Sequence, residues 1–246
     1  MNRLCDSAYS KATKFLPPDL AGRIDLLRPS FRGSFGGPLN GQQRRCEIVR
    51  DLARAISFDR VIETGTYRGT STEFFSAVMG TPIETVEANP RFLAYSSRRL
   101  AILPNVHVEP GDSRLFLQEL AKRPGITNES VFVYLDAHWE GDLPLAEELQ
   151  IIARSWTQAV VMIDDFQVPD DVGYAFDDYG TGRALTESYL PKEDLVGWRL
   201  CYPRAQSSDE TGARRGCGVL VSPAMFEQVS GVASLRLASP GAGVAG

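Results

Sequence analysis

Apolar residues along the chain follow two spacings, which indicate strands and helices in turn. Short apolar runs predict buried strands, and segments in which apolar residues recur every three or four positions predict amphipathic helices. A helix over 46–56 leads into the first strand, and strands and helices then alternate. We expect strands at 60–63, 83–87, 105–109, 131–136 and 159–164, and helices at 70–79, 90–100, 113–122 and 144–154.

Strands separated by helices predict parallel pairing, because each connection must cross one face of the sheet, and such crossovers are right-handed. Two helix starts support the assignment, since Asn89 before Pro90 and Ser113 can each act as an N-terminal cap. Two last strands, at 198–202 and 218–221, resemble a hairpin at the sheet edge. The predicted fold is α/β: a doubly wound, Rossmann-like, mostly parallel seven-stranded sheet with helices on both faces.

Three segments lie outside this alternation. Residues 1–44 are rich in Pro and Gly, and we expect an N-terminal arm that can act as a substrate lid. The main domain spans 45–225, and a polar, aromatic and acidic insertion at 166–197 interrupts it as a second candidate lid. Residues 226–246 form a C-terminal segment, and we expect its tail of small residues, 239–246, to be disordered.

Composition excludes several classes of protein. A chain of 246 residues, 43% hydrophobic and 23% charged, can bury the core of one large domain. A net charge of −5, spread along the chain, gives no footprint for nucleic acid or an anionic membrane. The four cysteines form no C-x-x-C pair, and we find neither a signal-peptide core nor a run long enough to span a bilayer. We expect a cytoplasmic protein with a small-molecule partner, and the sequence indicates no oligomeric state.

A strand, a glycine turn and a helix start follow one another at 61–71. Gly65 allows the backbone to approach a ligand, Gly69 allows the helix to start against the strand, and the helix N-terminus offers free N–H groups. Glu87 ends the second strand, where a carboxylate can accept both hydroxyls of a ribose. A dinucleotide fingerprint would need glycine where the chain has Tyr67, so nicotinamide cofactors are disfavoured.

These motifs, Glu63-x-Gly65-x-x-x-Gly69, Glu87 and Gly111-Asp112-Ser113, occur in the same order as the cofactor motifs of class I S-adenosylmethionine-dependent methyltransferases. The chain resembles that family over residues 45 to 222. The resemblance implies that Glu63 positions the methionine amine, Glu87 holds the ribose, and Asp112 with Ser113 meets the adenine. The cofactor-binding residues predicted in this way are Glu63, Gly65, Thr66, Gly69, Thr70, Ser71, Glu87, Asp112, Ser113 and Asp136.

Acidic residues end the fourth and fifth strands. Asp136, Asp164 and Asp165 should meet at the carboxyl edge of the sheet, where they repel one another unless a cation or donors compensate. Oxygen ligands of this kind favour Mg²⁺. The spacing is similar to the metal triad of metal-dependent O-methyltransferases, above all the branch that methylates sugar hydroxyls and more distantly the catechol branch. Alternatively, these aspartates only cap turns at the strand ends.

The two histidines call for different interpretations. We expect His107, inside the third strand, to pack or to face solvent. His138 stands two residues after Asp136, where the sugar-methylating branch often carries an acidic general base, and an imidazole can abstract the same proton. The alternative is that His138 only packs against Trp139 or supports the loop.

Together these features predict an O-methyltransferase that transfers the methyl group of S-adenosylmethionine to a hydroxyl of a small molecule. Mg²⁺ would hold a sugar, a phenol or a vicinal diol, and His138 would take the proton. One alternative is a metal-independent methyltransferase in which Asp136 and Asp164 bind the substrate. A second is a nucleotide-sugar-dependent transferase that uses Asp164 and Asp165 on a metal diphosphate. A third is a cofactor-binding module without activity.

Overall fold

A computed structural model describes residue 13, residues 15–138 and residues 141–238. The predictions for Trp139 and for the tail 239–246 lie outside these residues. The strands are β1 (Arg60–Thr64), β2 (Ile83–Glu87), β3 (Val106–Pro110), β4 (Val131–Leu135), β5 (Ala159–Asp164), β6 (Arg199–Pro203), β7 (Cys217–Val221) and β8 (Leu235–Leu237). The α-helices are α2 (Pro18–Asp25), α3 (Pro29–Arg32), α4 (Gln43–Ala55), α5 (Thr70–Met79), α6 (Pro90–Leu100), α7 (Ser113–Ala121), α8 (Leu145–Ser155) and α9 (Phe226–Ser230).

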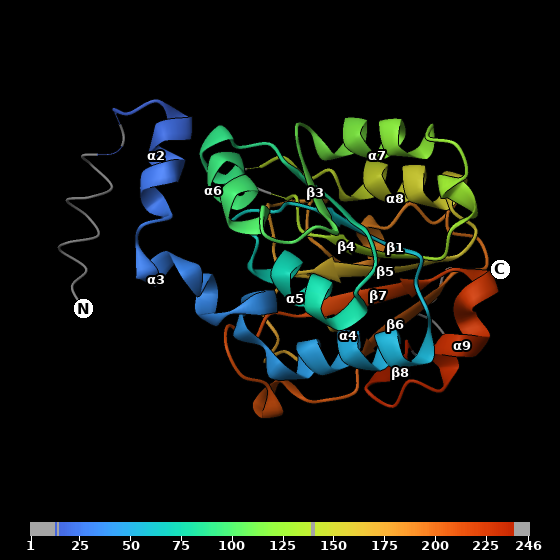
Figure 1. Ribbon diagram of the computed structural model, residues 1–246. Coiled ribbons are helices and arrows are strands. Elements are labelled where there is room, and N and C mark those ends of the chain that lie inside the picture. Colours follow the sequence, from blue (N-terminus) through green and yellow to red (C-terminus); the bar gives the residue numbers. More distant parts are fainter. Residues whose placement is uncertain (1–12, 14, 139–140, 239–246) are drawn as a thin grey trace.

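The described strands form one sheet in the order β3-β2-β1-β4-β5-β7-β6-β8 (Figure 1). The first five strands in this order pair in parallel, as predicted, and β7, β6 and β8 pair antiparallel. The sequence predicted seven strands, and β8 is the additional one. It is only three residues long, too short for an alternation of apolar and polar residues to identify it.

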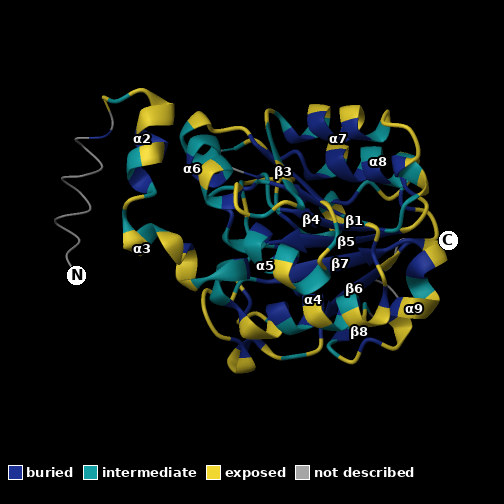
Figure 2. Cartoon of the chain, in the orientation of Figure 1, coloured by how far each residue is buried: buried dark blue, intermediate teal, exposed yellow. Residues whose placement is uncertain are grey.

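Helices cover both faces of the sheet (Figure 1). Along β4, Val131, Val133 and Leu135 pack with the apolar side chains of α7 and α8. Phe132 and Tyr134 point to the opposite face, where they join the side chains of α4 and α5. Because the central strands are covered on both faces, the side chains of β1, β2, β4, β5 and β7 are almost all buried (Figure 2), whereas those of the edge strand β3 are partly or fully exposed.

The N-terminal segment is tied to the rest of the domain. Helix α2 packs against α6, and the Arg91 guanidinium binds the buried carboxylate of Asp25 with N–O distances of 2.6 and 2.8 Å. Short 3₁₀ turns at Ser34–Gly36 and Pro38–Gly41 then bring the chain to the carboxyl edge of the sheet. In the described part of the chain, every helix is too short or too polar to serve as a membrane span.

One predicted helix cap is confirmed and one is wrong. The Asn89 side chain accepts the backbone N–H groups of Arg91 and Phe92 at the start of α6. At the start of α7 the cap is Asp112, whose carboxylate accepts two backbone N–H groups, and Ser113 is the first helical residue. Aspartate and serine both cap helices well, so the residue types alone do not decide whether Asp112 or Ser113 is the cap. The position of the cap depends on the preceding turn, in which Gly111 has a φ of 138°.

Candidate functional site

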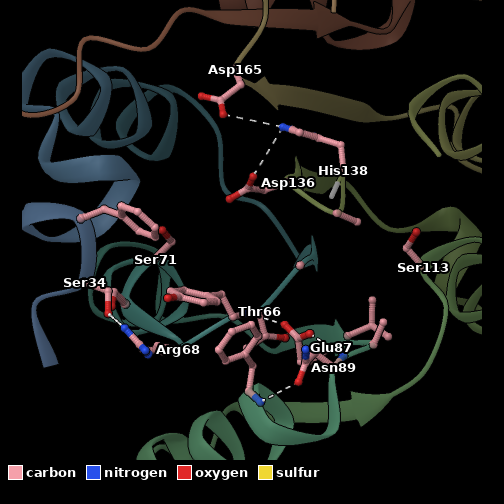
Figure 3. A pocket seen from close by; sticks show the side chains of 18 of the residues that line it. Ser34, Thr66, Arg68, Ser71, Glu87, Asn89, Ser113, Asp136, His138 and Asp165 are labelled. Atoms are coloured by element: carbon pink, nitrogen blue, oxygen red, sulfur yellow. Dashed lines mark hydrogen bonds and ion pairs between the residues drawn. The ribbon is translucent and has the colours of Figure 1, made fainter. Parts of the chain in front are cut away.

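A cavity of about 530 Å³ opens at the carboxyl ends of the parallel strands (Figure 3). The loop after β1, the ends of β2 and β4, the turn between β3 and α7 and the 3₁₀ turns of the N-terminal segment contribute to its wall. The predicted site residues that line it are Gly65, Thr66, Thr70, Ser71, Glu87, Asp112, Ser113, Asp136, His138 and Asp165. Glu63, Gly69 and Asp164 are not among the described residues that line the cavity.

The glycine turn brings two strand ends into contact. Gly65 has a φ of 86°, and a Cβ atom there would lie only 2.2 Å from the carbonyl oxygen of Asp136 at the end of β4. Gly69, with a φ of 71°, precedes α5 and offers no side-chain cap, so N–H groups at the helix start are left for a ligand. Thr70 and Ser71 of this helix start line the cavity.

Glu87 presents a prepared carboxylate at the end of β2. Its Oε2 accepts the backbone N–H of Tyr67 at 2.6 Å, and its Oε1 accepts the backbone N–H of Asn89 at 2.7 Å. Burial raises the pKa of Glu87, and these backbone hydrogen bonds oppose the rise. The backbone N–H of Ala88 also hydrogen-bonds to this carboxylate, which leaves part of its acceptor capacity for a hydroxyl group of a ligand.

Glu63 lies behind the glycine turn instead of facing the cavity. Its Oε2 accepts the hydroxyl groups of Thr72 at 2.5 Å and Thr85 at 2.6 Å, and the residue is 1% exposed. Burial raises the pKa of Glu63 to about 8, although both hydroxyl groups oppose the rise. Glu63 therefore ties β1 to β2 and α5, and the structure does not bring it to the cavity for the predicted contact with a methionine amine.

Asp112 and Ser113 line the cavity beyond β3. The Asp112 carboxylate caps α7 and pairs with Arg114, the two side chains lying 2.6 Å apart. The hydrogen bond from Arg114 lowers the pKa of Asp112. Asp112 is therefore a fixed, ionised acceptor on the side of the cavity formed by β3 and α7.

Asp164 is buried and fully hydrogen-bonded. Its Oδ1 accepts the backbone N–H of Asp165 at 2.8 Å and pairs with the guanidinium of Arg45, which is 1% exposed. Its Oδ2 accepts the Tyr134 hydroxyl at 2.7 Å and the Asn40 amide at 3.1 Å. Each oxygen of a carboxylate accepts about two hydrogen bonds, so these four donors use the whole capacity of Asp164.

Asp165 and Asp177 share one guanidinium group. Arg215 Nε donates to Asp165 Oδ1 at 2.7 Å, and Arg215 Nη2 pairs with Asp177 Oδ1. The remaining Asp177 oxygen, Oδ2, accepts the Tyr179 hydroxyl at 2.8 Å. Asp165 has a φ of 51°, a left-handed conformation that is uncommon outside glycine and that the surrounding contacts must hold.

His138 follows β4 and its side chain is 6% exposed. Its Nε2 lies 3.9 Å from Asp136 Oδ1 and 3.8 Å from Asp165 Oδ2 (Figure 3). It also lies 3.7 Å from Asp177 Oδ2. Three carboxylates from β4, from the end of β5 and from the insertion therefore surround one imidazole nitrogen at the wall of the cavity.

The charges in this cluster separate the pKa values of its members. Burial alone would lower the pKa of His138, but Asp165, Asp136 and Asp177 outweigh burial and raise it. Burial alone would raise the pKa of Asp165, but hydrogen bonding to His138 and Arg215 lowers it to about 2. Burial raises the pKa of Asp136 to about 7, with Asp165 adding to the rise and His138 opposing it. The cluster thus holds an ionised Asp165 beside an imidazole and a second carboxyl group whose pKa values are both raised.

Solved structures share this architecture. An O-methyltransferase from Bacillus cereus, solved in complex with SAH, is 14% identical and has a TM-score of 0.57, covering 89% of this chain and 97% of that chain. TomG, the O-methyltransferase from Streptomyces achromogenes involved in tomaymycin synthesis and solved with SAM, is 18% identical and has a TM-score of 0.53, covering 72% of this chain and 79% of that chain. The chain has the class I methyltransferase fold. The fold class predicted from the sequence is therefore confirmed.

Sequence comparison adds no closer relationship, since no family model and no curated protein matches the chain. A further similar structure, a putative O-methyltransferase from Klebsiella pneumoniae, is 14% identical with a TM-score of 0.53, covering 89% of this chain and 96% of that chain. At this level of identity the comparisons establish the methyltransferase fold, and the roles of individual residues depend on the geometry of the site.

The residues present fit S-adenosylmethionine in this methyltransferase fold. Pockets that enclose small ligands usually measure about 300–1,000 Å³, a range that includes this cavity. The Glu87 carboxylate keeps acceptor capacity for a ribose hydroxyl, and the start of α5 offers N–H groups for a carboxylate. Asp112 offers an ionised acceptor on the β3 side.

The residues present do not fit the predicted Mg²⁺ triad. Asp164 has no free lone pair, and Asp165 already pairs with Arg215. The ligand atoms of His138, Asp165 and Asp177 do lie within 4.8 Å of one another. However, this group includes an imidazole, whereas Mg²⁺ prefers oxygen ligands, and Arg215 already occupies one oxygen of each carboxylate. We therefore derive no step through a metal ion.

Sequence reasoning missed three residues that shape this site: Asp177, Arg45 and Arg215. Asp177 belongs to the insertion, whose acidic and aromatic composition indicates a role at the site but does not show which of its residues reaches the cavity. Arg45 and Arg215 could have been sought as partners, because clustered carboxylates require compensating charge. Nothing in their local sequence distinguishes them from arginines on the surface.

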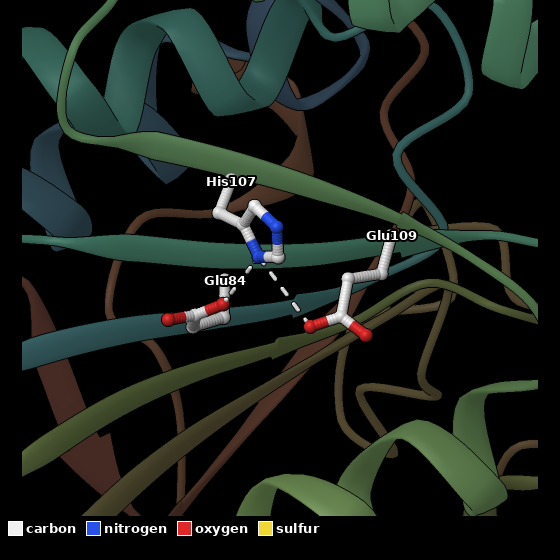
Figure 4. Close-up of side chains that lie close together, drawn as sticks. All are labelled: Glu84, His107 and Glu109. Atoms are coloured by element: carbon white, nitrogen blue, oxygen red, sulfur yellow. Dashed lines mark hydrogen bonds and ion pairs between the residues drawn. The ribbon is translucent and has the colours of Figure 1, made fainter.

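A second group of acids and a histidine lies on β2 and β3, away from the cavity (Figure 4). His107 Nδ1 lies 3.0 Å from Glu84 Oε2 and 3.4 Å from Glu109 Oε1, and the His107 side chain is 61% exposed. Arg60 and Arg123 pair with these acids. His107 thus faces solvent in a network of surface ion pairs.

Proposed function

We propose that the protein is an S-adenosylmethionine-dependent O-methyltransferase that acts on a hydroxyl of a small molecule, with His138 as the proton acceptor. The observation that carries the proposal is the position of His138 at the wall of the cofactor-sized cavity, with its Nε2 between Asp136, Asp165 and Asp177. A charged carboxylate beside an imidazole orients the ring and stabilises the imidazolium that forms on proton transfer.

When bound, S-adenosylmethionine supplies a methyl group on a positively charged sulfur, and the S–C bond breaks with its electron pair staying on sulfur as the new O–C bond forms. The chain contributes position and proton transfer. Glu87 and Asp112 hold the cofactor at two places in the cavity, and His138 Nε2 accepts the proton that the hydroxyl releases. Asp165 stays ionised, because its hydrogen bonds with His138 and Arg215 hold the pKa of its carboxyl well below the usual range.

The acceptor is a sugar, a phenol or another small diol in this proposal. The insertion and the N-terminal segment both line the cavity, through Asp177 and through Ser34, Phe35 and Asn40, so the acceptor can be enclosed from two sides. A nucleotide-sugar transferase is disfavoured, because it needs Asp164 and Asp165 on a metal diphosphate and Asp164 has no free lone pair.

The test is release of S-adenosylhomocysteine from S-adenosylmethionine in the presence of catechols, phenols and free sugars. We expect at least one acceptor class to support turnover, and we expect His138→Ala to reduce that turnover by about 10²–10⁴-fold, the usual contribution of a positioned acid–base group. His107→Ala is the matched control, because this histidine lies outside the cavity lining. Equal turnover in the His138 variant and the parent would refute the role of His138.

A further inference from the structure

The acids around the cavity are neutralised by cations that belong to the chain itself. The carboxylate of Asp164 pairs with Arg45, and those of Asp165 and Asp177 pair with Arg215. His138 supplies a third positive charge when it is protonated, and the neighbouring acids raise its pKa. Arg45 and Arg215 are the two cations that are always charged here, and together they bring the two positive charges that a divalent metal would supply.

Arg215 is fixed in place by groups that do not belong to the cavity wall. Its backbone N–H donates to the Gln42 side chain at 2.7 Å, and its carbonyl accepts the Gln42 amide at 2.8 Å. Arg45 also donates to this carbonyl and to that of Gly216. Gln42 and Arg45 are each 1% exposed, so the position of the Arg215 backbone is set by the buried start of α4.

This arrangement determines which carboxylate oxygens meet His138. Arg215 takes Oδ1 of Asp165 and Oδ1 of Asp177, and the Oδ2 atoms of the same two residues lie 3.8 and 3.7 Å from His138 Nε2. A planar guanidinium can bind two carboxylates at once in a fixed geometry, which an ammonium group cannot do. Arg215 thus aims both acids at the imidazole.

We propose that Arg215 replaces a divalent metal in this site: it is a positioning residue that pairs with both Asp165 and Asp177 and holds them against His138, so that methyl transfer proceeds without a bound metal ion. The inference rests on the proposed function for the identity of the reaction. A dication among the oxygens that face His138 would lie close to the guanidinium and be repelled by it. Removal of the guanidinium should therefore create a metal site.

The ligands released in this way would be one imidazole and the carboxylates of Asp165 and Asp177, a mixed set that suits Mn²⁺ better than Mg²⁺. The experiment titrates Mn²⁺ by calorimetry into the full-length parent, Arg215→Met, Arg215→Lys and the control Arg214→Met. Arg214 is the adjacent, exposed arginine and its Nε donates to the Glu210 carbonyl. Turnover is measured for the same proteins in EDTA and with added Mn²⁺.

We expect no Mn²⁺ binding and full turnover in EDTA for the parent and for Arg214→Met. Arg215→Met should bind Mn²⁺ and lose turnover by about 10²-fold, the scale on which a small misplacement of catalytic groups acts. Arg215→Lys keeps the positive charge but loses the planar guanidinium that binds both carboxylates, so it should lose turnover without gaining Mn²⁺ binding.

Three outcomes would overturn the inference: a parent that loses turnover in EDTA and recovers it with metal, a parent that binds Mn²⁺ through His138 and Asp177, or an Arg215→Met variant with parental turnover and no Mn²⁺ binding. If Arg215→Met does not fold, the parent and Arg215→Lys still test the inference, because both proteins keep a positive charge at position 215. Failure of the proposed function is distinguishable, because it would appear as a parent without affinity for S-adenosylhomocysteine, whatever the Mn²⁺ titration shows.

Discussion

Substitution of Asp164 by Asn separates a structural role from a metal-binding role. In the structure, Asp164 is 1% exposed, pairs with the equally buried Arg45 and accepts three further hydrogen bonds. The Asn side chain keeps one acceptor oxygen but replaces the other with an NH₂ group and removes the charge. Arg45 would then be left as a buried cation without an ionised partner, which is strongly unfavourable.

The expected cost follows from the burial of the pair. Breaking a buried ion pair by removing one partner lowers the free energy of unfolding by about 3–5 kcal/mol. For a chain of this size each kcal/mol shifts the midpoint of thermal unfolding by about 2–4 °C, so we expect a decrease of roughly 6–20 °C. The assay is thermal unfolding followed by circular dichroism, supported by urea denaturation.

Asp194→Asn is the matched control. Asp194 also pairs with an arginine, Arg154, at 2.8 Å, but the Arg154 side chain is 70% exposed. An ion pair of this kind contributes at most about 1 kcal/mol, so the control should unfold within a few degrees of the parent. If Asp164→Asn were as stable as Asp194→Asn, the structural account of Asp164 would be wrong and a role as a metal ligand would regain support.

Three further predictions concern pH and backbone geometry. Glu63 has a pKa of about 8 in the folded protein and about 4.3 when unfolded, so its contribution to stability is lost as pH rises across that window, and Glu63→Gln should flatten the decline in urea denaturation measured between pH 5 and pH 8. His138 accepts a proton only when neutral and its pKa is raised, so kcat should increase with pH through an acidic limb above pH 6.5, and that limb should be absent from the pH–rate profile of His138→Ala. Gly65→Ala should abolish S-adenosylhomocysteine binding or folding, because its Cβ would lie 2.2 Å from the Asp136 carbonyl oxygen. Calorimetry and circular dichroism test this, and Gly80→Ala is the control, since φ is also positive at Gly80 but the surrounding space is open.

The fold could be predicted because its information is local. The central parallel strands β4 and β5 are nearly continuous apolar runs, and the helices between the strands carry an apolar face, so periodicity is sufficient to order the elements. The cap of α7 and the strand β8 escaped the same reasoning for local reasons as well. Asp112 and Ser113 are adjacent residues that both cap helices, and β8 is too short to show a period.

The cofactor side of the site was also accessible from the sequence, since the glycine turn and Glu87 lie at the ends of identifiable strands and both line the cavity. The cluster of carboxylates could be predicted only in part. Clustered negative charges require nearby cations, but the sequence does not show that Arg45 and Arg215 supply them. Arg45 lies 119 residues from Asp164 in the chain, and Arg215 lies 50 residues from Asp165 and 38 from Asp177, so only the folded chain brings these groups together.

The central claim is that the cavity binds S-adenosylmethionine through Glu87, and calorimetric titration with S-adenosylhomocysteine tests it most directly. We expect the parent to bind and Glu87→Gln to bind about 10²-fold more weakly, because hydrogen bonds to a charged acceptor contribute about 1.5–3 kcal/mol each. Glu84→Gln is the control, since Glu84 belongs to the same strand but pairs with Arg60 outside the cavity lining. A parent without affinity for S-adenosylhomocysteine, or a Glu87→Gln variant with the affinity of the parent, would contradict the claim.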